Sequence, residues 1–199
     1  MIDNHKLVEI FKAIAREISL RKDELTELDR LIGDSDHGTN MDRGFSYVLS
    51  EIDNYKDKDL SEIFTFVGKS LMAKIGGASG PLYGMVFVRA ASIFKDQTVL
   101  NEELFQRFLT SAVASLQTYG QANYLDKTML DVWMPLNKEY QHNKNKMDLI
   151  KQIDEYVMAT KVRQALKGRA SYLKERSIGV IDPGSLSSSI ILKEFIKEI

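Results

Sequence analysis

Apolar residues recur at intervals of three and four along most of the chain, which is the spacing of one face of a helix. The clearest run spans 104–119, follows Asn101, a residue that caps helix N-termini, and precedes Gly120, a typical helix stop. The same spacing marks the segments 7–18, 41–52, 60–75, 153–160 and 186–199. No run alternates apolar and polar residues between hairpin signals, although 85–88 is short, apolar and ambiguous. The pattern predicts about eight or nine helices.

The segments between these helices are short, and no linker rich in proline or serine divides the chain. A content of 44% hydrophobic and 28% charged residues is typical of a globular protein with a sizeable core. We therefore expect one all-α domain over residues 1–199, arranged as a helical bundle. Pro135 lies inside the otherwise helical stretch 127–140 and is expected to kink or break it.

Charge and cysteine content exclude several classes of function. The 27 Lys and Arg residues balance 28 Asp and Glu residues, so no basic excess favours nucleic acid or an anionic membrane as a partner. The absence of cysteine excludes disulfides, thiolate catalysis and cysteine-based zinc sites. The first residues lack the pattern of a signal peptide, and the longest charge-free stretch, 108–125, is too polar for a membrane span. We expect a cytoplasmic protein.

Three aspartates lie close together just before the predicted helix at 41–52. Asp29, Asp34 and Asp36 would repel one another without a cation, and carboxylate oxygens suit Mg²⁺ or Ca²⁺. The segment does not fit an EF-hand, a phosphate-binding loop or a nucleophile elbow, because residues that these motifs require are missing. The alternative is an acidic turn that caps the helix through Asp36 or Thr39.

Two further glycine-containing segments resemble helix starts that could bind an anion. In the stretch 76–84, Ser79 precedes Pro81, as at a helix N-terminus whose positive end faces phosphate. Tight packing of two helices would explain the same glycines. Later in the chain, Arg169 offers a guanidinium group for an anion, and the residues 182–184 form a rigid turn into the last helix. Together with the aspartates, these segments suggest a site for a magnesium-bound nucleotide.

The motifs, in their order along the chain, resemble those of the nucleotide-binding L subunits of dihydroxyacetone kinases. They are Asp29-x4-Asp34-x-Asp36-His37-Gly38, the stretch 77–84, Gly168-Arg169-Ala170-Ser171-Tyr172 and Asp182-Pro183-Gly184. The resemblance runs from about residue 7 to about residue 192 and implies an up-and-down antiparallel helical barrel with the nucleotide at one end. Ser35 departs from the family, which often has glycine there, and this change could shift the turn while leaving the carboxylates in place.

The resemblance also implies which residues form the site. Asp29, Asp34 and Asp36 would bind two Mg²⁺ ions that also hold the diphosphate. Nucleotide contacts would come from His37, Gly38, Thr39, Asn40, Ala78, Ser79, Gly120, Met129, Arg169, Asp182, Pro183 and Gly184. Two ions agree with the charge balance, because three carboxylates and ADP together carry about six negative charges.

A length of 199 residues leaves no room for the substrate-binding domain found in ATP-dependent relatives, so the chain resembles the separate ADP-binding subunit of the phosphoenolpyruvate-dependent bacterial system. That resemblance implies tightly bound ADP, which a phosphohistidine of the M subunit converts to ATP in place. The phosphoryl group would then pass to dihydroxyacetone held by the K subunit. Positioning and electrostatics, rather than a protein nucleophile, would carry this catalysis.

Two alternatives stay open at this point: an L-type domain of another kinase, and a regulatory module that binds nucleotide without phosphoryl transfer. The sequence also leaves open whether the chain forms a homodimer.

Overall fold

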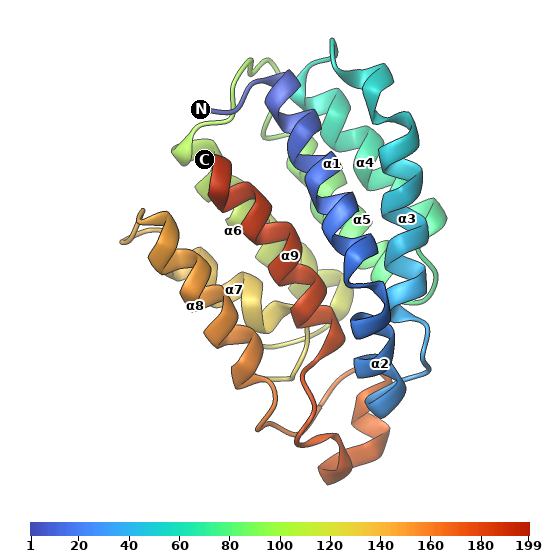
Figure 1. The fold of residues 1–199 in the computed structure, drawn as a ribbon. Coiled ribbons are helices and arrows are strands. Elements are labelled where there is room, and N and C mark those ends of the chain that lie inside the picture. Colours follow the sequence, from blue (N-terminus) through green and yellow to red (C-terminus); the bar gives the residue numbers. More distant parts are fainter.

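The computed structural model describes residues 1–199, and its regular elements are all helices (Figure 1). The α-helices are α1 (Asn4–Leu20), α2 (Lys22–Ile32), α3 (His37–Glu51), α4 (Leu60–Lys74), α5 (Ser79–Ala91), α6 (Glu102–Gly120), α7 (Leu130–Glu139), α8 (Lys146–Ala159) and α9 (Pro183–Glu198). Two 3₁₀ helices, η1 (Ile52–Tyr55) and η2 (Arg169–Ser177), complete the set. The all-α prediction is confirmed, and the ambiguous residues 85–88 lie inside α5.

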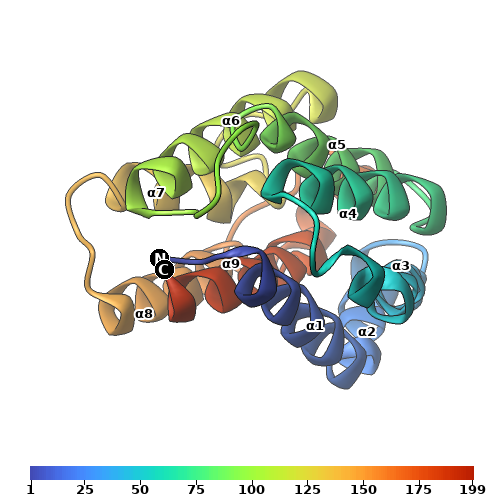
Figure 2. The same ribbon diagram turned by 90° about the horizontal axis from the view of Figure 1, so that it is seen from above.

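The helices form a closed ring, which Figure 2 shows end-on. Going round the ring, α1, α3, α4, α5, α6, α7, α8 and α9 each pack against the next, and α9 closes the ring against α1. Helix α2 continues from the end of α1 outside this ring and contacts α3 and α9 (Figure 1). The helices are thus arranged as the up-and-down barrel that the family resemblance implies.

A local signal explains where α6 begins. Asn101 caps α6 as predicted, because its side-chain oxygen accepts the N–H of Leu104 at 2.9 Å. Helix α6 also ends at Gly120, but the following residue, Gln121, takes the left-handed conformation that glycine would adopt more easily. Pro135 does not break α7, which continues on both sides of it. The buried side chains of the neighbouring residues Trp133 and Leu136 hold α7 to the core, which explains why the helix continues.

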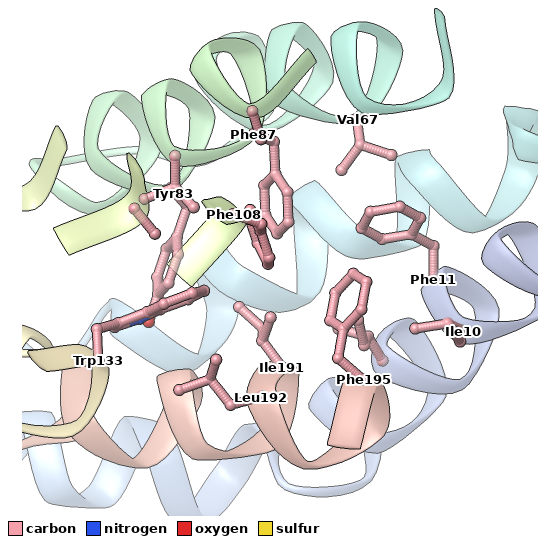
Figure 3. Packing of buried hydrophobic residues seen from close by; sticks show 14 of the residues in the cluster. Ile10, Phe11, Val67, Tyr83, Phe87, Phe108, Trp133, Ile191, Leu192 and Phe195 are labelled. Atoms are coloured by element: carbon pink, nitrogen blue, oxygen red, sulfur yellow. The ribbon is translucent and has the colours of Figure 1, made fainter. Parts of the chain in front are cut away.

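Aromatic side chains fill the middle of the barrel (Figure 3). The ring of Phe108 on α6 packs edge-on against Trp133 of α7, with the ring centres 5.8 Å apart, and lies 5.6 Å from Phe195 of α9. Phe11 of α1 packs in the same edge-on way against Phe87 of α5. These contacts join opposite sides of the ring, so the interior is a solid core rather than a channel. No helix has an apolar stretch of the length and low charge needed to cross a membrane.

Candidate nucleotide and metal site

A cavity of about 400 Å³ opens at one end of the barrel. This volume lies in the range of small-molecule sites. The wall is built from loops, from residues of α2 and α6, and from the first residues of α3, α5, α7 and α9, which are His37, Ser79, Leu130 and Pro183. Helix N-termini carry partial positive charge and unpaired N–H groups, so several of them around one cavity favour an anionic ligand.

The three aspartates meet at the rim of this cavity. One oxygen from each of Asp29, Asp34 and Asp36 lies within 4.8 Å of the others. Asp29 belongs to α2 rather than to the turn, whereas Asp34 and Asp36 lie in the turn between α2 and α3. This spacing of carboxylate oxygens is compatible with a hard divalent cation between them.

Asp29 also ties α3 to α2. Its Oδ2 atom accepts the backbone N–H groups of Asp36, at 2.9 Å, and His37, at 3.1 Å. The alternative interpretation assigned the cap of α3 to Asp36 or Thr39. Asp36 does occupy the cap position, but its side chain makes no capping hydrogen bond. The capping role belongs to Asp29, and the carboxylate of Asp36 stays available for a ligand.

The backbone of the turn fits the carboxylate cluster. A Cβ atom at Gly33 would lie only 1.9 Å from Oδ1 of Asp29, so this position must lack a side chain for Asp29 to keep its place. Ser35 has a φ of +66°, in the left-handed region that favours glycine. The serine therefore keeps a glycine-like turn, at a cost in backbone strain, and the three carboxylates still converge.

Arg169 reaches the same cluster from η2. Its guanidinium group lies 3.1 Å from Oδ2 of Asp34. One guanidinium group offsets only part of the charge of three carboxylates, and the remaining repulsion favours a bound cation. The residues present therefore fit Mg²⁺: oxygen ligands alone, converging at an open rim, beside helix N-termini that suit phosphate.

His37 links the cavity to a buried chain of hydroxyl groups. One ring nitrogen lies 3.3 Å from Oγ of Ser79, and the other lies 2.9 Å from Oγ of Ser187. Ser187 in turn bonds the hydroxyl of Tyr83 at 2.7 Å, and Tyr83 bonds Ser188 at 2.8 Å. Burial lowers the pKa of His37 to about 4, so the imidazole is neutral at neutral pH. Burial also raises the pKa of Tyr83, which keeps its hydroxyl protonated.

Asp182 caps α9 and also lines the cavity. Its side chain accepts the N–H of Ser185 at 2.6 Å, as the predicted rigid turn requires. Burial raises the pKa of Asp182 to about 7, against the opposing effect of the Ser185 hydrogen bonds. Asp182 therefore keeps its proton to a higher pH than an exposed aspartate does.

Most of the predicted site residues line this cavity together. Those in its wall are Asp29, Asp34, Asp36, His37, Asn40, Ala78, Ser79, Gly120, Met129, Arg169, Asp182, Pro183 and Gly184. Gly38 and Thr39 are not among the residues that line it, and their contact with a nucleotide stays a prediction. Gly38 is where α3 passes close to α2, because a Cβ there would lie 2.1 Å from the carbonyl oxygen of Lys22. The hydroxyl of Thr39 donates to the carbonyl of Asp36 at 2.9 Å.

Two groups that shape the site were not predicted from the sequence. One is the hydroxyl chain behind His37. The other is the loop between α6 and α7. Asp131, in the first turn of α7, accepts the N–H groups of Leu125 and Thr128 from this loop and lies 3.2 Å from the Arg163 guanidinium. In the same loop Lys127 is buried. Its only sequence signal is a cluster of charged residues beside the predicted contact Met129.

This fold and site define a known class of protein: the chain belongs to the DAK2 domain family, which matches residues 31–197. It is 41% identical over 184 residues to the Escherichia coli protein named PEP-dependent dihydroxyacetone kinase, ADP-binding subunit DhaL, covering 88% of this chain and 87% of that protein. It is 39% identical over 183 residues to the Lactococcus lactis protein named PTS-dependent dihydroxyacetone kinase, ADP-binding subunit DhaL. That match covers 92% of this chain and 91% of that protein. The resemblance to L subunits is thereby confirmed.

A solved structure supports the fold. The crystal structure of the dihydroxyacetone kinase from C. freundii in complex with AMP-PNP and Mg²⁺ matches this chain with a TM-score of 0.76 and 20% sequence identity. The match covers 96% of this chain and 33% of that chain. The helical barrel is therefore a fold that occurs as one part of a larger kinase.

Proposed function

We propose that this chain is the ADP-binding subunit of a phosphoenolpyruvate-dependent dihydroxyacetone kinase, and so a phosphotransferase subunit. It would hold ADP with two Mg²⁺ ions, receive a phosphoryl group from a phosphohistidine of an M subunit, and pass that group to dihydroxyacetone held by a K subunit. The observation that carries the proposal is the convergence of three carboxylates and several helix N-termini on one cavity. The names of the similar proteins from E. coli and L. lactis support the same assignment.

Each part of the cavity would serve one part of the nucleotide. Asp29, Asp34 and Asp36 would hold the metal ions, which neutralise phosphate charge during in-line transfer. The first turns of α5 and α9 would donate backbone N–H groups to phosphate oxygens, and Arg169 would add a guanidinium group. The chain thus contributes position and electrostatics, and no protein side chain needs to become phosphorylated.

A second part of the cavity wall, unlike the carboxylate cluster in composition, is apolar and suits the adenine ring. Leu82 of α5 and Leu116 of α6 line it together with Met129. Gly120 lies at the same wall, where a Cβ would be 3.4 Å from the side chain of Leu82, so this wall has little space to spare. Flat apolar walls with a few polar groups at one end are typical of nucleotide sites.

Residues 1–199 would form one nucleotide-binding domain that acts in the cytoplasm with separate K and M subunits. The cavity is open at the end of the barrel, so a partner can reach the phosphate end without unfolding any helix. Neither the transfer from the M subunit nor the transfer to dihydroxyacetone requires a second copy of this chain, so the proposed function does not depend on a homodimer.

Native mass spectrometry of the purified chain tests the cofactor assignment. We expect added mass for one ADP and two Mg²⁺ that survives buffer exchange. Labelled phosphoryl transfer from purified phospho-M subunit to the bound ADP tests the activity, with Asp34→Asn as the matched control. A chain that binds ADP but accepts no phosphoryl group would instead support the regulatory module. Transfer to an acceptor other than dihydroxyacetone would support a domain of another kinase.

A further inference from the structure

Lys127 is a buried lysine that none of the proposed nucleotide or metal contacts explains. It lies in the loop between α6 and α7 with a φ of +62°, and only 1% of its surface is exposed. Its ammonium group donates hydrogen bonds to the backbone carbonyls of Arg163, at 3.1 Å, and Ser177, at 2.5 Å. Burying an ammonium group is costly unless its N–H groups are paired, and burial accordingly lowers the pKa of Lys127.

The two carbonyls stand at the two ends of one surface segment, residues 163–177. The same ends carry two more links: the N–H of Ala165 donates to Oγ of Ser177 at 2.9 Å, and the N–H of Leu166 donates to the carbonyl of Asp126 at 3.0 Å. Asp126 and Lys127 are neighbours in the sequence. The loop between α6 and α7 therefore fixes the base of the 163–177 segment.

The middle of the 163–177 segment forms part of the cavity wall, through Lys167, Gly168, Arg169 and Ala170. In Figure 1 this segment lies beside α2 at the lower end of the barrel. The side chain of Arg169 is 69% exposed and meets the carboxylate cluster through its ion pair with Asp34. An exposed ion pair is a weak restraint, so the position of Arg169 depends on how the base of the segment is held.

We propose that Lys127 is a positioning residue that joins the two ends of the 163–177 segment and thereby holds Arg169 at the phosphate end of the cavity. An apolar side chain would fill the same space without the cost of burying a charge, but it could not bond two carbonyls that are distant in the sequence. The inference deepens the proposed function and rests on it, because it assigns to Lys127 an effect on a bound nucleotide through Arg169.

A double-mutant cycle tests this role. Lys127→Met, Arg169→Ala and the double variant are loaded with radiolabelled ADP and Mg²⁺, and the dissociation rate is measured after adding unlabelled ADP. We expect each single variant to release ADP about tenfold faster, the effect of losing a charge-assisted hydrogen bond. The double variant should release it no faster than Arg169→Ala alone. Lys161→Met, which removes an exposed lysine nearby, should match the wild type.

A second readout requires no nucleotide. Trypsin cleaves after lysine and arginine, and the 163–177 segment offers Arg163, Lys167, Arg169, Lys174 and Arg176. We expect Lys127→Met to be cut in this segment several-fold faster than wild type or Lys161→Met, while far-ultraviolet circular dichroism shows unchanged helix content. Should Lys127→Met fail to fold, Lys127→Gln, which keeps an amide donor, replaces it in both experiments.

Independent effects of Lys127→Met and Arg169→Ala, with the double variant releasing ADP about a hundredfold faster, would overturn the inference, because Lys127 would then act without Arg169. Wild-type cleavage of Lys127→Met in the segment would overturn it as well. A wild-type chain that retains no ADP would overturn the proposed function, and the cleavage experiment would still decide whether Lys127 holds the segment. The two failures are therefore distinguishable.

Discussion

Asp29 has two roles in this structure, as a helix cap and as a candidate metal ligand, and substitution can separate them. In buffer with EDTA only the capping role operates. Asp29→Ala removes a buried carboxylate that accepts the N–H groups of Asp36 and His37. Losing a cap costs about 1–2 kcal/mol, and hydrogen bonds to a charged group are stronger than average, so we expect a loss of about 2–3 kcal/mol. For a chain of this size the melting temperature falls by roughly 4–12 °C.

Asp34→Ala is the matched control, because Asp34 belongs to the same cluster but supports no helix. Its side chain is 33% exposed, and its ion-pair partner is the still more exposed Arg169. Exposed ion pairs contribute about 0.2–1 kcal/mol, and removing one of three neighbouring carboxylates relieves repulsion. We therefore expect the melting temperature of Asp34→Ala in EDTA to lie close to that of the wild type.

Adding Mg²⁺ and ADP tests the second role of Asp29, that of a metal ligand. A ligand at a hundred times its dissociation constant stabilises the folded state by about 2.7 kcal/mol, and both variants should lose this gain. The assay is thermal unfolding followed by circular dichroism, with and without the ligands. Asp29→Ala melting like the wild type in EDTA would refute the capping role. Asp34→Ala keeping the full gain from Mg²⁺ and ADP would refute the metal assignment.

Three further predictions concern strain and protonation. Ser35→Gly relieves the strain of the left-handed turn and should raise the free energy of urea unfolding by about 0.5–1 kcal/mol, whereas a decrease would contradict this account. Because burial lowers the pKa of His37 to about 4, its NMR ring signals should stay constant from about pH 8 down to about pH 5, and a shift in that range would show a charged imidazole. Because burial raises the pKa of Asp182 to about 7, the folded state holds a proton between about pH 4 and 7 that the unfolded state has released, and this proton's contribution to stability falls as pH rises. Asp182→Asn should therefore gain stability relative to the wild type from about pH 5 to about pH 7 in urea unfolding, and parallel curves would refute the shift.

The features that the sequence predicted depend on signals between near neighbours in the chain. Apolar spacing and the cap at Asn101 predicted α6, and both signals come from residues that are close together in the chain. The three aspartates were grouped because they lie close together in the sequence. Helix α2, which carries Asp29, is absent from the segments marked by apolar spacing, because few of its residues are buried and its apolar face is a weak signal.

The features that the sequence missed depend on contacts between distant segments. Tyr83 and Ser187 come from α5 and α9 and meet only because the barrel closes. The serines 187–189 resemble the solvent face of a helix, yet all of them are buried. In the sequence Lys127 resembles an ordinary loop lysine. Only the fold brings the carbonyls of Arg163 and Ser177, which are distant in the chain, within hydrogen-bond distance of it. Residue type alone cannot distinguish a solvated polar side chain from one whose partner lies in another helix.

The glycines of the first motif show how the packing of helices sets the chemistry of the site. Gly38 lets α3 approach the carbonyl of Lys22 on α2, and Gly33 leaves space for the carboxylate of Asp29. Both glycines therefore fix how α2 meets α3, and this contact brings Asp29 to the start of α3 beside Asp34 and Asp36. The spacing of the carboxylates is thus set by the contact between two helices together with the turn that carries Asp34 and Asp36.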